Sequence, residues 1–130
     1  MYVLDTNTLI YFFKGMGKVS EQLLAKNPKD IALPTIVVYE LEVGIARSSF
    51  PQKRRTQLQE LASLVHILPF GYQEALKAAS IRVDIERKGL LIGPYDILIA
   101  ATALSNKGTL VTHNLKEFRR IKGLQLEDWF

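Results

Sequence analysis

The sequence predicts a single α/β domain over residues 1–130, built on a twisted parallel sheet of about four or five strands flanked by helices in an α/β/α arrangement. The chain opens with a short apolar run, Tyr2–Leu4, which stops at Asp5 and is followed by the helix-like stretch Leu9–Phe13. Short β-favouring runs and helical stretches then alternate to the end. A chain of 130 residues has the usual size of one domain, and no repeat or linker interrupts it.

The first half of the chain shows a recognisable break after each element. The segment Gly15–Gly17 ends the first helix, and the turn Asn27–Asp30 precedes the second strand. Pro34 and Thr35 begin a long helix, for which Thr35 is the expected N-cap. The expected segments are a strand over Tyr2–Leu4, helices over Leu9–Phe13 and Val19–Ala25, a strand over Ile31–Leu33, and helices over Ile36–Ser48 and Gln52–Leu64.

The second half continues the alternation. Gly89 is expected to stop one helix, and Pro94 suits the first turn of the next. That next helix is apolar nearly all round, so we expect it to be buried. The expected segments are a strand over Val65–Leu68, helices over Tyr72–Lys88 and Tyr95–Ser105, a strand over Gly108–Thr112, a helical turn over Leu115–Phe118 and an edge strand over Leu124–Leu126.

Composition excludes several classes of function. The chain has no cysteine, which rules out disulfides, thiolate metal sites and thiol catalysis and fits a reducing compartment, so we expect a cytoplasmic protein. No signal-peptide pattern opens the sequence, and no apolar run approaches ~18 residues, so no membrane span is expected. The net charge of +4 is a mild bias toward polyanions.

Two acids in the first half of the chain are candidates for a site. Asp5 follows the first strand, at the edge where open parallel sheets bind ligands, although alone it is better explained, like Thr6, as a helix cap. Glu40 lies on the apolar side of its helix, and Gly44 one turn later leaves room for a close approach. The ordinary explanation for Glu40 is an ion pair with a Lys or Arg.

Two acids in the second half resemble them in position. Asp96 lies in the most apolar helix, where its ordinary role is a favourable interaction with the helix dipole. Glu117 follows the strand Gly108–Thr112 and could be a surface acid among basic neighbours. If the strands are parallel, Asp5 and Glu117 open onto the same edge. Hydroxyl and amide groups at these strand ends add support: Thr6, Asn7, Thr112 and Asn114.

Such a group of acids, without histidine or cysteine ligands, suits a hard divalent cation, Mg²⁺ or Mn²⁺, and phosphoryl transfer to water. Three rival classes lack a required feature. A haloacid-dehalogenase phosphatase would need an Asp where Asn7 lies. A receiver domain would need an extra acidic pair near the first strand and a Lys after a late strand. An NTPase would need a Gly-rich phosphate loop.

Several short motifs follow one another along the chain. They are Leu4–Asn7 (LDTN), Tyr39–Gly44 (YELEVG), Ile92–Ala101 (IGPYDILIAA), Val111–Asn114 (VTHN) followed by Glu117 and Phe118, and Gly123–Trp129 (GLQLEDW). Together they make the whole chain resemble the PIN-domain ribonucleases, specifically the VapC toxins of bacterial type II toxin–antitoxin pairs. Each motif alone is weak, and their order carries the resemblance.

The resemblance implies an Mg²⁺-dependent endoribonuclease with metal-binding acids at Asp5, Glu40 and Asp96 and a fourth near the last strand, where Glu117 is the nearest acid. It implies a homodimer and a VapB-type antitoxin that places a basic side chain in the acidic pocket. The RNA is often a tRNA, cut in its anticodon stem-loop. Basic residues that could line a path for RNA phosphates are Lys53, Arg54, Arg55, Arg87, Lys88, Lys116, Arg119 and Arg120.

Two other functions fit the same fold. One is a non-catalytic module that binds RNA or a partner protein, which would show no metal-dependent cutting of tRNA. The other is a DNA-directed nuclease, which digestion of single-stranded DNA beside RNA would reveal. The chain is too short for the helical arch of the larger flap-type relatives.

Overall fold

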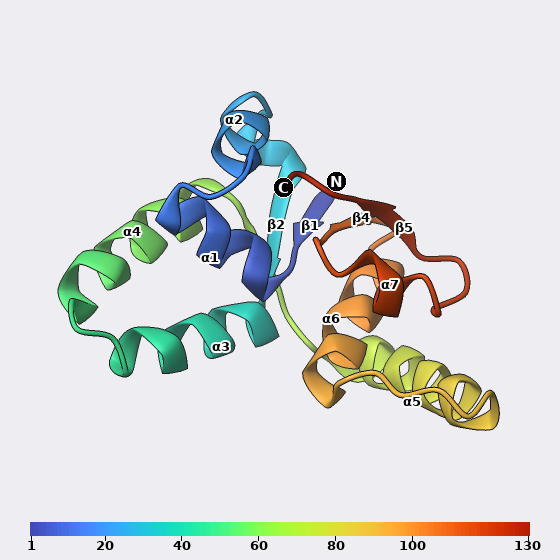
Figure 1. Ribbon diagram of the computed structural model, residues 1–130. Helices are drawn as coiled ribbons and strands as arrows, with labels where there is room; N and C mark the ends of the chain where they lie inside the picture. The colour runs from blue at the N-terminus through green and yellow to red at the C-terminus, as the bar shows by residue number, and fades with distance from the viewer.

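A computed structural model describes residues 1–130. Its centre is a five-stranded sheet in the order β3-β2-β1-β4-β5, in which every neighbouring pair is parallel (Figure 1). The predicted parallel α/β sheet is therefore confirmed. The strands are β1 (Tyr2–Leu4), β2 (Ile31–Pro34), β3 (His66–Leu68), β4 (Thr109–Val111) and β5 (Gln125–Glu127).

The first strand lies in the middle of the sheet, although it is first in the chain. It pairs with β2 on one side, through Tyr2 and Ile31, and with β4 on the other, where Leu4 pairs with Val111. Just beyond this last pair, the N–H of Asp5 donates to the carbonyl of Val111 at 3.1 Å. The carboxyl ends of β1 and β4 are thus level, which brings Asp5 and the residues after Val111 to one edge.

Helices form two groups around the sheet. In Figure 1, α1, α3 and α4 lie together on one side of the view, and α5, α6 and α7 lie on the other. The group containing α6 meets α3 below the carboxyl edge of the sheet. The helices are α1 (Thr6–Lys14), α2 (Val19–Leu24), α3 (Thr35–Ala46), α4 (Pro51–Leu64), α5 (Tyr72–Arg87), α6 (Pro94–Ser105) and α7 (Leu115–Phe118), with a 3₁₀ turn over Pro28–Asp30.

Most observed boundaries lie within about three residues of the expected ones, and two of the differences have a clear structural cause. Thr35 is not an N-cap: Pro34 takes that position with extended backbone, and α3 begins at Thr35 without a side-chain cap bond. Gly108 lies before β4 rather than in it. A Cβ at Gly108 would come 2.7 Å from Cγ2 of Val3, so only glycine fits at this turn into the sheet.

The core surrounds the central strands and α6. Val3, Leu4, Leu110 and Val111 are buried in the strands. As predicted, α6 is buried on most of its surface: Ile97, Ile99, Ala100, Ala101 and Ala103 are all inaccessible or nearly so. At 12 residues this helix is far too short to cross a bilayer. None of the other helices combines the length and apolarity that a membrane span requires.

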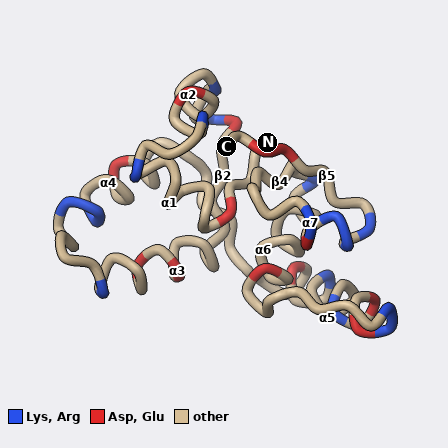
Figure 2. Tube along the Cα trace, viewed as in Figure 1, with Lys and Arg blue, Asp and Glu red and all other residues tan.

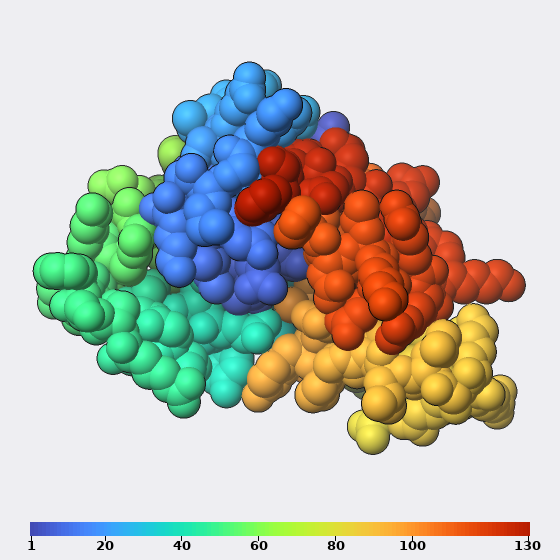
Figure 3. All heavy atoms as spheres, viewed as in Figure 1, coloured from blue at the N-terminus to red at the C-terminus, as the bar shows by residue number.

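The C-terminal segment returns to the beginning of the chain. Figure 3 shows the last residues, in dark red, lying against the blue N-terminal helix. The rings of Tyr11 and Phe130 are 4.9 Å apart there, and the N–H of Lys18 donates to the carbonyl of Phe130 at 2.8 Å. This return closes one side of the edge where the predicted acids gather.

Candidate functional site

The predicted acids come from four separate elements around the carboxyl edge of the sheet. Asp5 lies between β1 and α1, Glu40 in α3, Asp96 in the first turn of α6 and Glu117 in the first turn of α7. Figure 2 shows acidic positions on the facing parts of α3, α6 and α7, while most basic residues lie towards the periphery.

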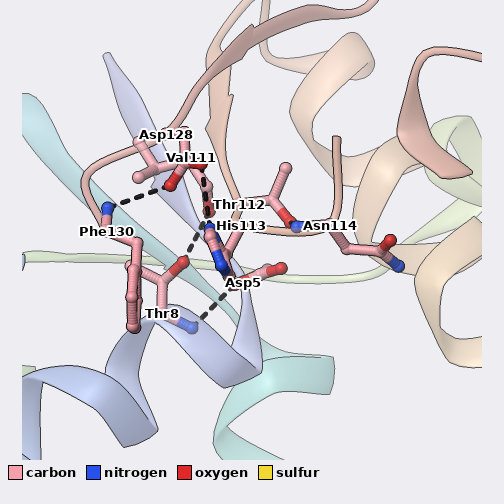
Figure 4. A network of polar contacts seen from close by, with 8 residues as sticks. All are labelled: Asp5, Thr8, Val111, Thr112, His113, Asn114, Asp128 and Phe130. Carbon is pink, nitrogen blue, oxygen red and sulfur yellow. Dashed lines mark hydrogen bonds and ion pairs between the residues drawn. The ribbon is translucent and has the colours of Figure 1, made fainter. Parts of the chain in front are cut away.

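Asp5 is held more firmly than the other acids. Its side chain is 5% exposed, and Oδ1 accepts a hydrogen bond of 2.9 Å from the N–H of Thr8, so Asp5 does cap α1 (Figure 4). Burial raises the pKa of the Asp5 carboxyl, while hydrogen bonds from Thr112 and Thr8 oppose the rise. Capping and site formation are therefore compatible, because the cap bond orients the carboxylate at the strand end.

Glu40 is half-buried and accepts a hydrogen bond of 2.7 Å at Oε1 from the hydroxyl of Thr6. No Lys or Arg forms an ion pair with it, which excludes the ordinary explanation for an acid on an apolar face. No other part of the fold approaches Gly44: a Cβ built there meets nothing within 4 Å. Gly44 instead lines an open groove beside Glu40.

Asp96 connects the four acids electrostatically. Burial raises its pKa from 3.8 to about 6, and the charges of Asp5, Glu117 and Glu40 add to the rise in that order. Asp96 also lies in the first turn of α6, where the helix dipole favours an acid. The dipole therefore accounts for its place in the helix but not for its carboxylate neighbours, which come from three other elements.

Glu117 is oriented by Asn114, the residue that directly precedes α7. The amide nitrogen Nδ2 of Asn114 donates to Oε2 of Glu117 at 2.7 Å, and the backbone N–H of Asn114 donates to the hydroxyl of Thr112 at 3.0 Å. Thr112 also opposes the rise in the pKa of the Asp5 carboxyl, which places Thr112 beside that acid. Three of the predicted supporting residues make such contacts, whereas Asn7 is exposed and makes none of them.

The donor set fits a hard divalent cation. All four side chains offer carboxylate oxygens, and no Lys or Arg forms an ion pair with any of them. No three of them lie close enough to ligate one ion as they stand. Like charges repel across a low-dielectric site, so a cation would be needed to draw these oxygens together. The pKa of Asp96 is raised first by burial and then by this uncompensated repulsion.

The basic residues expected along an RNA path fall into two classes. Four have partners in the fold: Arg54 donates to the carbonyl of Phe13 and to Gln57, Arg55 pairs with Glu42, Lys88 with Asp84, and Arg120 donates to the carbonyl of Leu91. The other four are exposed and make no ion pair: Lys53, Arg87, Lys116 and Arg119. Of the exposed four, Lys116 and Arg119 are the two that lie beside a site acid in the sequence, on either side of Glu117.

Sequence reasoning missed how the C-terminal segment contributes. The Nδ1 of His113 lies 2.9 Å from Oδ2 of Asp128, and the His113 ring stacks on Phe130 with centroids 4.2 Å apart (Figure 4). Thr8 was also missed, although it is buried and donates its hydroxyl to the carbonyl of Val111. Neither partner is close in sequence, so no local pattern signals these contacts.

A comparison of the sequence with known families matches the PIN domain over residues 2–124. The chain therefore belongs to the PIN domain family. It is similar to a relative called ribonuclease VapC2 from Rickettsia felis, with 37% identity over 99% of this chain and 98% of the relative. It is also 34% identical to the tRNA(fMet)-specific endonuclease VapC of Salmonella typhimurium, over 98% of this chain and 97% of that protein.

Solved structures agree with this placement. The VapBC2 structure from Rickettsia felis, bound to a DNA fragment from its promoter, contains a chain that superposes with a TM-score of 0.89 at 37% identity. The match covers 99% of this chain and 98% of that chain. Within the PIN domain family, the sequence and the fold both place the chain among the VapC proteins, as the motifs had indicated.

Proposed function

We propose that this protein is the ribonuclease toxin of a VapBC-type toxin–antitoxin pair, and that Asp5, Glu40, Asp96 and Glu117 hold Mg²⁺ or Mn²⁺ for RNA hydrolysis. The observation that carries the proposal is the unpaired position of Asp96: its pKa is raised to about 6, first by burial and then by the charges of the other three acids, and no Lys or Arg pairs with any of the four. Four carboxylates from distant elements would be unfavourable together without a cation. The names of the similar proteins support the same reading.

Each site residue has a role that its contacts define. Asp5 would be the most rigid ligand, because it is buried and its carboxylate caps α1. Thr6 orients Glu40, and Asn114 orients Glu117, as hydrogen-bonding partners of metal ligands commonly do. A bound Mg²⁺ or Mn²⁺ would supply the positive charge that phosphodiester hydrolysis requires at its phosphate oxygens. The side chains of this protein then position the RNA phosphate at the carboxyl edge of the sheet.

The proposed substrate is RNA, specifically the anticodon stem-loop of a tRNA, since one similar protein is named a tRNA(fMet)-specific endonuclease. Lys116 and Arg119 flank Glu117 on the short helix α7 and its end, and both are exposed. Phosphates approaching the acids would meet these two cations first on that side. Arg54 and Arg55 are engaged within the fold, so Lys53 is the freer cation of its cluster.

The proposed antitoxin would approach along a groove between α1, α3 and α4. The groove has a volume of about 280 Å³, is lined by residues that include Ile10, Phe13, Leu41 and Ile45, and reaches Glu40. An antitoxin segment could bury apolar side chains in the groove and place a basic side chain beside the acids. A guanidinium there would compensate the carboxylate charge in place of a cation.

Homodimerisation also belongs to the proposal. An apolar cavity of about 640 Å³ lies between α5, α6 and the loop that joins them, with Leu90, Ile92, Ile97 and Leu98 in its lining. Leu91 at its rim is 81% exposed. Exposed apolar areas of this kind mark interaction surfaces. Light scattering of the purified chain would show whether two copies associate.

Digestion of purified total tRNA tests the proposed activity. Cleavage is expected with Mg²⁺, and it should stop with a chelator and return with excess Mn²⁺ or Mg²⁺. Single-stranded DNA of matched length serves as the comparison, and preferential cutting of DNA would replace the RNA proposal with the DNA-directed alternative. Binding of tRNA without any cleavage, over a range of Mg²⁺ and Mn²⁺ concentrations, would indicate the non-catalytic module instead.

Co-expression tests the proposed partner. A VapB-type protein encoded beside this chain should co-purify with it and should suppress the tRNA cleavage. Antitoxin variants in which each Lys or Arg in turn is replaced by Ala would identify the side chain that enters the acidic pocket. Full inhibition by an antitoxin lacking all such side chains would contradict charge compensation at Glu40.

A further inference from the structure

Two exposed tyrosines lie side by side next to the acids. Tyr39 directly precedes Glu40 in α3, and Tyr95 directly precedes Asp96 in α6. Their ring centroids are 5.7 Å apart with an interplanar angle of 64°, and their hydroxyl oxygens are 3.5 Å apart. Figure 3 shows the teal α3 and the orange beginning of α6 meeting on one face, where these two elements contact each other.

The pair lies where the two helices that carry Glu40 and Asp96 meet. Tyr39 and Glu40 are consecutive in α3, and Tyr95 and Asp96 are consecutive in the first turn of α6. The contact between the two rings joins these positions, and α3 and α6 contact each other as well. The two rings therefore border the acidic site between Glu40 and Asp96.

These rings are unusually accessible for such large apolar groups. Tyr39 is 51% exposed and Tyr95 is 43% exposed. The Lys side chain that does lie over aromatic rings, Lys26, covers Tyr2 and Trp129 on another part of the surface. A T-shaped pair presents the edge of one ring to the face of the other, so the remaining ring faces stay open to a further planar group.

We propose that Tyr39 and Tyr95 form a platform on which an unpaired nucleobase beside the cut phosphate stacks. The inference rests on the proposed function, since the acids must act on RNA for a base to lie here. Every base has a flat face, so stacking tolerates sequence variation but requires a base that is free of its own helix. The platform therefore selects single-stranded or looped RNA as the substrate class of this site.

Paired substitutions separate the ring from the hydroxyl. Tyr39→Leu and Tyr95→Leu remove the flat ring and keep an apolar side chain that suits a helix, whereas Tyr39→Phe and Tyr95→Phe keep the ring and remove only the hydroxyl. Tyr72→Leu is the matched control, because Tyr72 is 76% exposed at the first turn of α5 and takes no part in the Tyr39–Tyr95 pair. All proteins carry Asp5→Asn as well, so that the RNA stays whole.

The probe is a short single-stranded oligouridine with one 2-aminopurine, whose fluorescence falls when the base stacks. Its position is moved one nucleotide at a time, and affinity is measured for each position. The parent protein and both Phe variants should quench one position strongly and bind within about twofold of each other. Each Leu variant should lose that quench and roughly 5- to 150-fold in affinity, the range expected for one stacked base. Tyr72→Leu should match the parent.

Several results would overturn the platform. If the Leu variants keep both the quench and the affinity, the rings do not stack a base. If the Phe variants lose as much quench and affinity as the Leu variants, the effect belongs to the hydroxyls. An equal loss with a fully paired RNA duplex would show that no free base is involved. Leu variants that bind RNA normally but no longer bind the antitoxin would make the tyrosines a protein contact instead. The quench is read without cleavage, so it stays interpretable if the nuclease proposal itself fails.

Discussion

The hydroxyl of Thr6 donates a 2.7 Å hydrogen bond to Oε1 of Glu40, joining the start of α1 to the middle of α3 across 34 positions of the chain. This contact holds Glu40 of α3 beside Thr6, the residue that begins α1 shortly after the end of β1. The bond uses only Oε1 of Glu40, so Oε2 stays available to a ligand. The bond thus links a fold-forming turn to the geometry of the proposed metal site.

Removing the Thr6 hydroxyl should weaken metal binding without unfolding the protein. Thr6→Val keeps the side-chain shape but cannot donate to Glu40, so the Mg²⁺ concentration for half-maximal tRNA cleavage should rise roughly 10- to 100-fold, as for other partners of metal ligands. Thr6→Ser is the matched control and should behave like the parent. A Mg²⁺ titration that superposes for Val and Ser variants would show that the bond does not position Glu40.

Replacing Asp5 should separate its two roles. Asp5→Asn can still cap α1 but loses the charge, so tRNA cleavage should fall to background while thermal stability is retained or rises. Asp5→Ala should also abolish cleavage and in addition lower stability by about 1 kcal/mol, because the cap bond is lost. Glu60→Gln, at an exposed acid of α4, is the control and should leave both quantities unchanged. Cleavage by purified Asp5→Asn would remove Asp5 from the proposed metal site.

The raised pKa of Asp96 predicts how the metal-free protein responds to pH. A carboxyl group whose pKa rises to about 6 on folding, from 3.8, binds its proton more tightly in the folded state. The stability that this proton contributes is complete below 3.8 and is lost as the pH rises through about 6. Because Asp96 is only partly buried, the loss should be roughly 1–2 kcal/mol, less than the full shift implies.

Thermal melts with a chelator measure this effect. Asp96→Asn should melt at a higher temperature than the parent at pH 7.5, and the two should converge near pH 4. Added Mg²⁺ should raise the parent's melting temperature and leave that of Asp96→Asn nearly unchanged. Equal melting temperatures at pH 7.5 in the chelator would mean that no repulsion acts on Asp96.

Two glycines should respond in opposite ways to alanine. Gly108→Ala places a Cβ 2.7 Å from Cγ2 of Val3, so it should destabilise the protein by about 1–3 kcal/mol. Gly44→Ala adds a methyl group with nothing within 4 Å on α3, so it should stabilise by up to about 1 kcal/mol. Urea unfolding of both variants beside the parent checks the pair. Similar effects of the two changes would contradict the packing described around Gly108.

Most of the elements were predictable because their causes are local. The run Tyr2–Leu4, the breaks at Gly15 and Gly89 and the proline at the start of α6 each act within a few residues, and the elements lie close to where these signals place them. Thr35 shows the limit of such signals. Its hydroxyl suits a cap, but Pro34 completes β2 with extended backbone and takes the N-cap position itself.

The site was predictable only in part. Asp5, Glu40, Asp96 and Glu117 stood out because acids at strand ends and on apolar helix faces are expensive without a partner. Their hydrogen-bonding partners Thr6 and Asn114 could be named as residue types, but not assigned to particular acids. The partners of Arg54 and Arg120 could not be foreseen, since both donate to backbone carbonyls of distant segments.

By itself, the amino-acid sequence determined which segments become strands and helices, which acids lack an obvious partner and which family the motifs belong to. Only the tertiary structure decided that β4 lies beside β1 with level carboxyl ends, that Asp128 meets His113, and that Tyr39 meets Tyr95. Periodicity and capping depend on neighbours within one or two turns, whereas these meetings depend on strand order and helix packing over the whole chain.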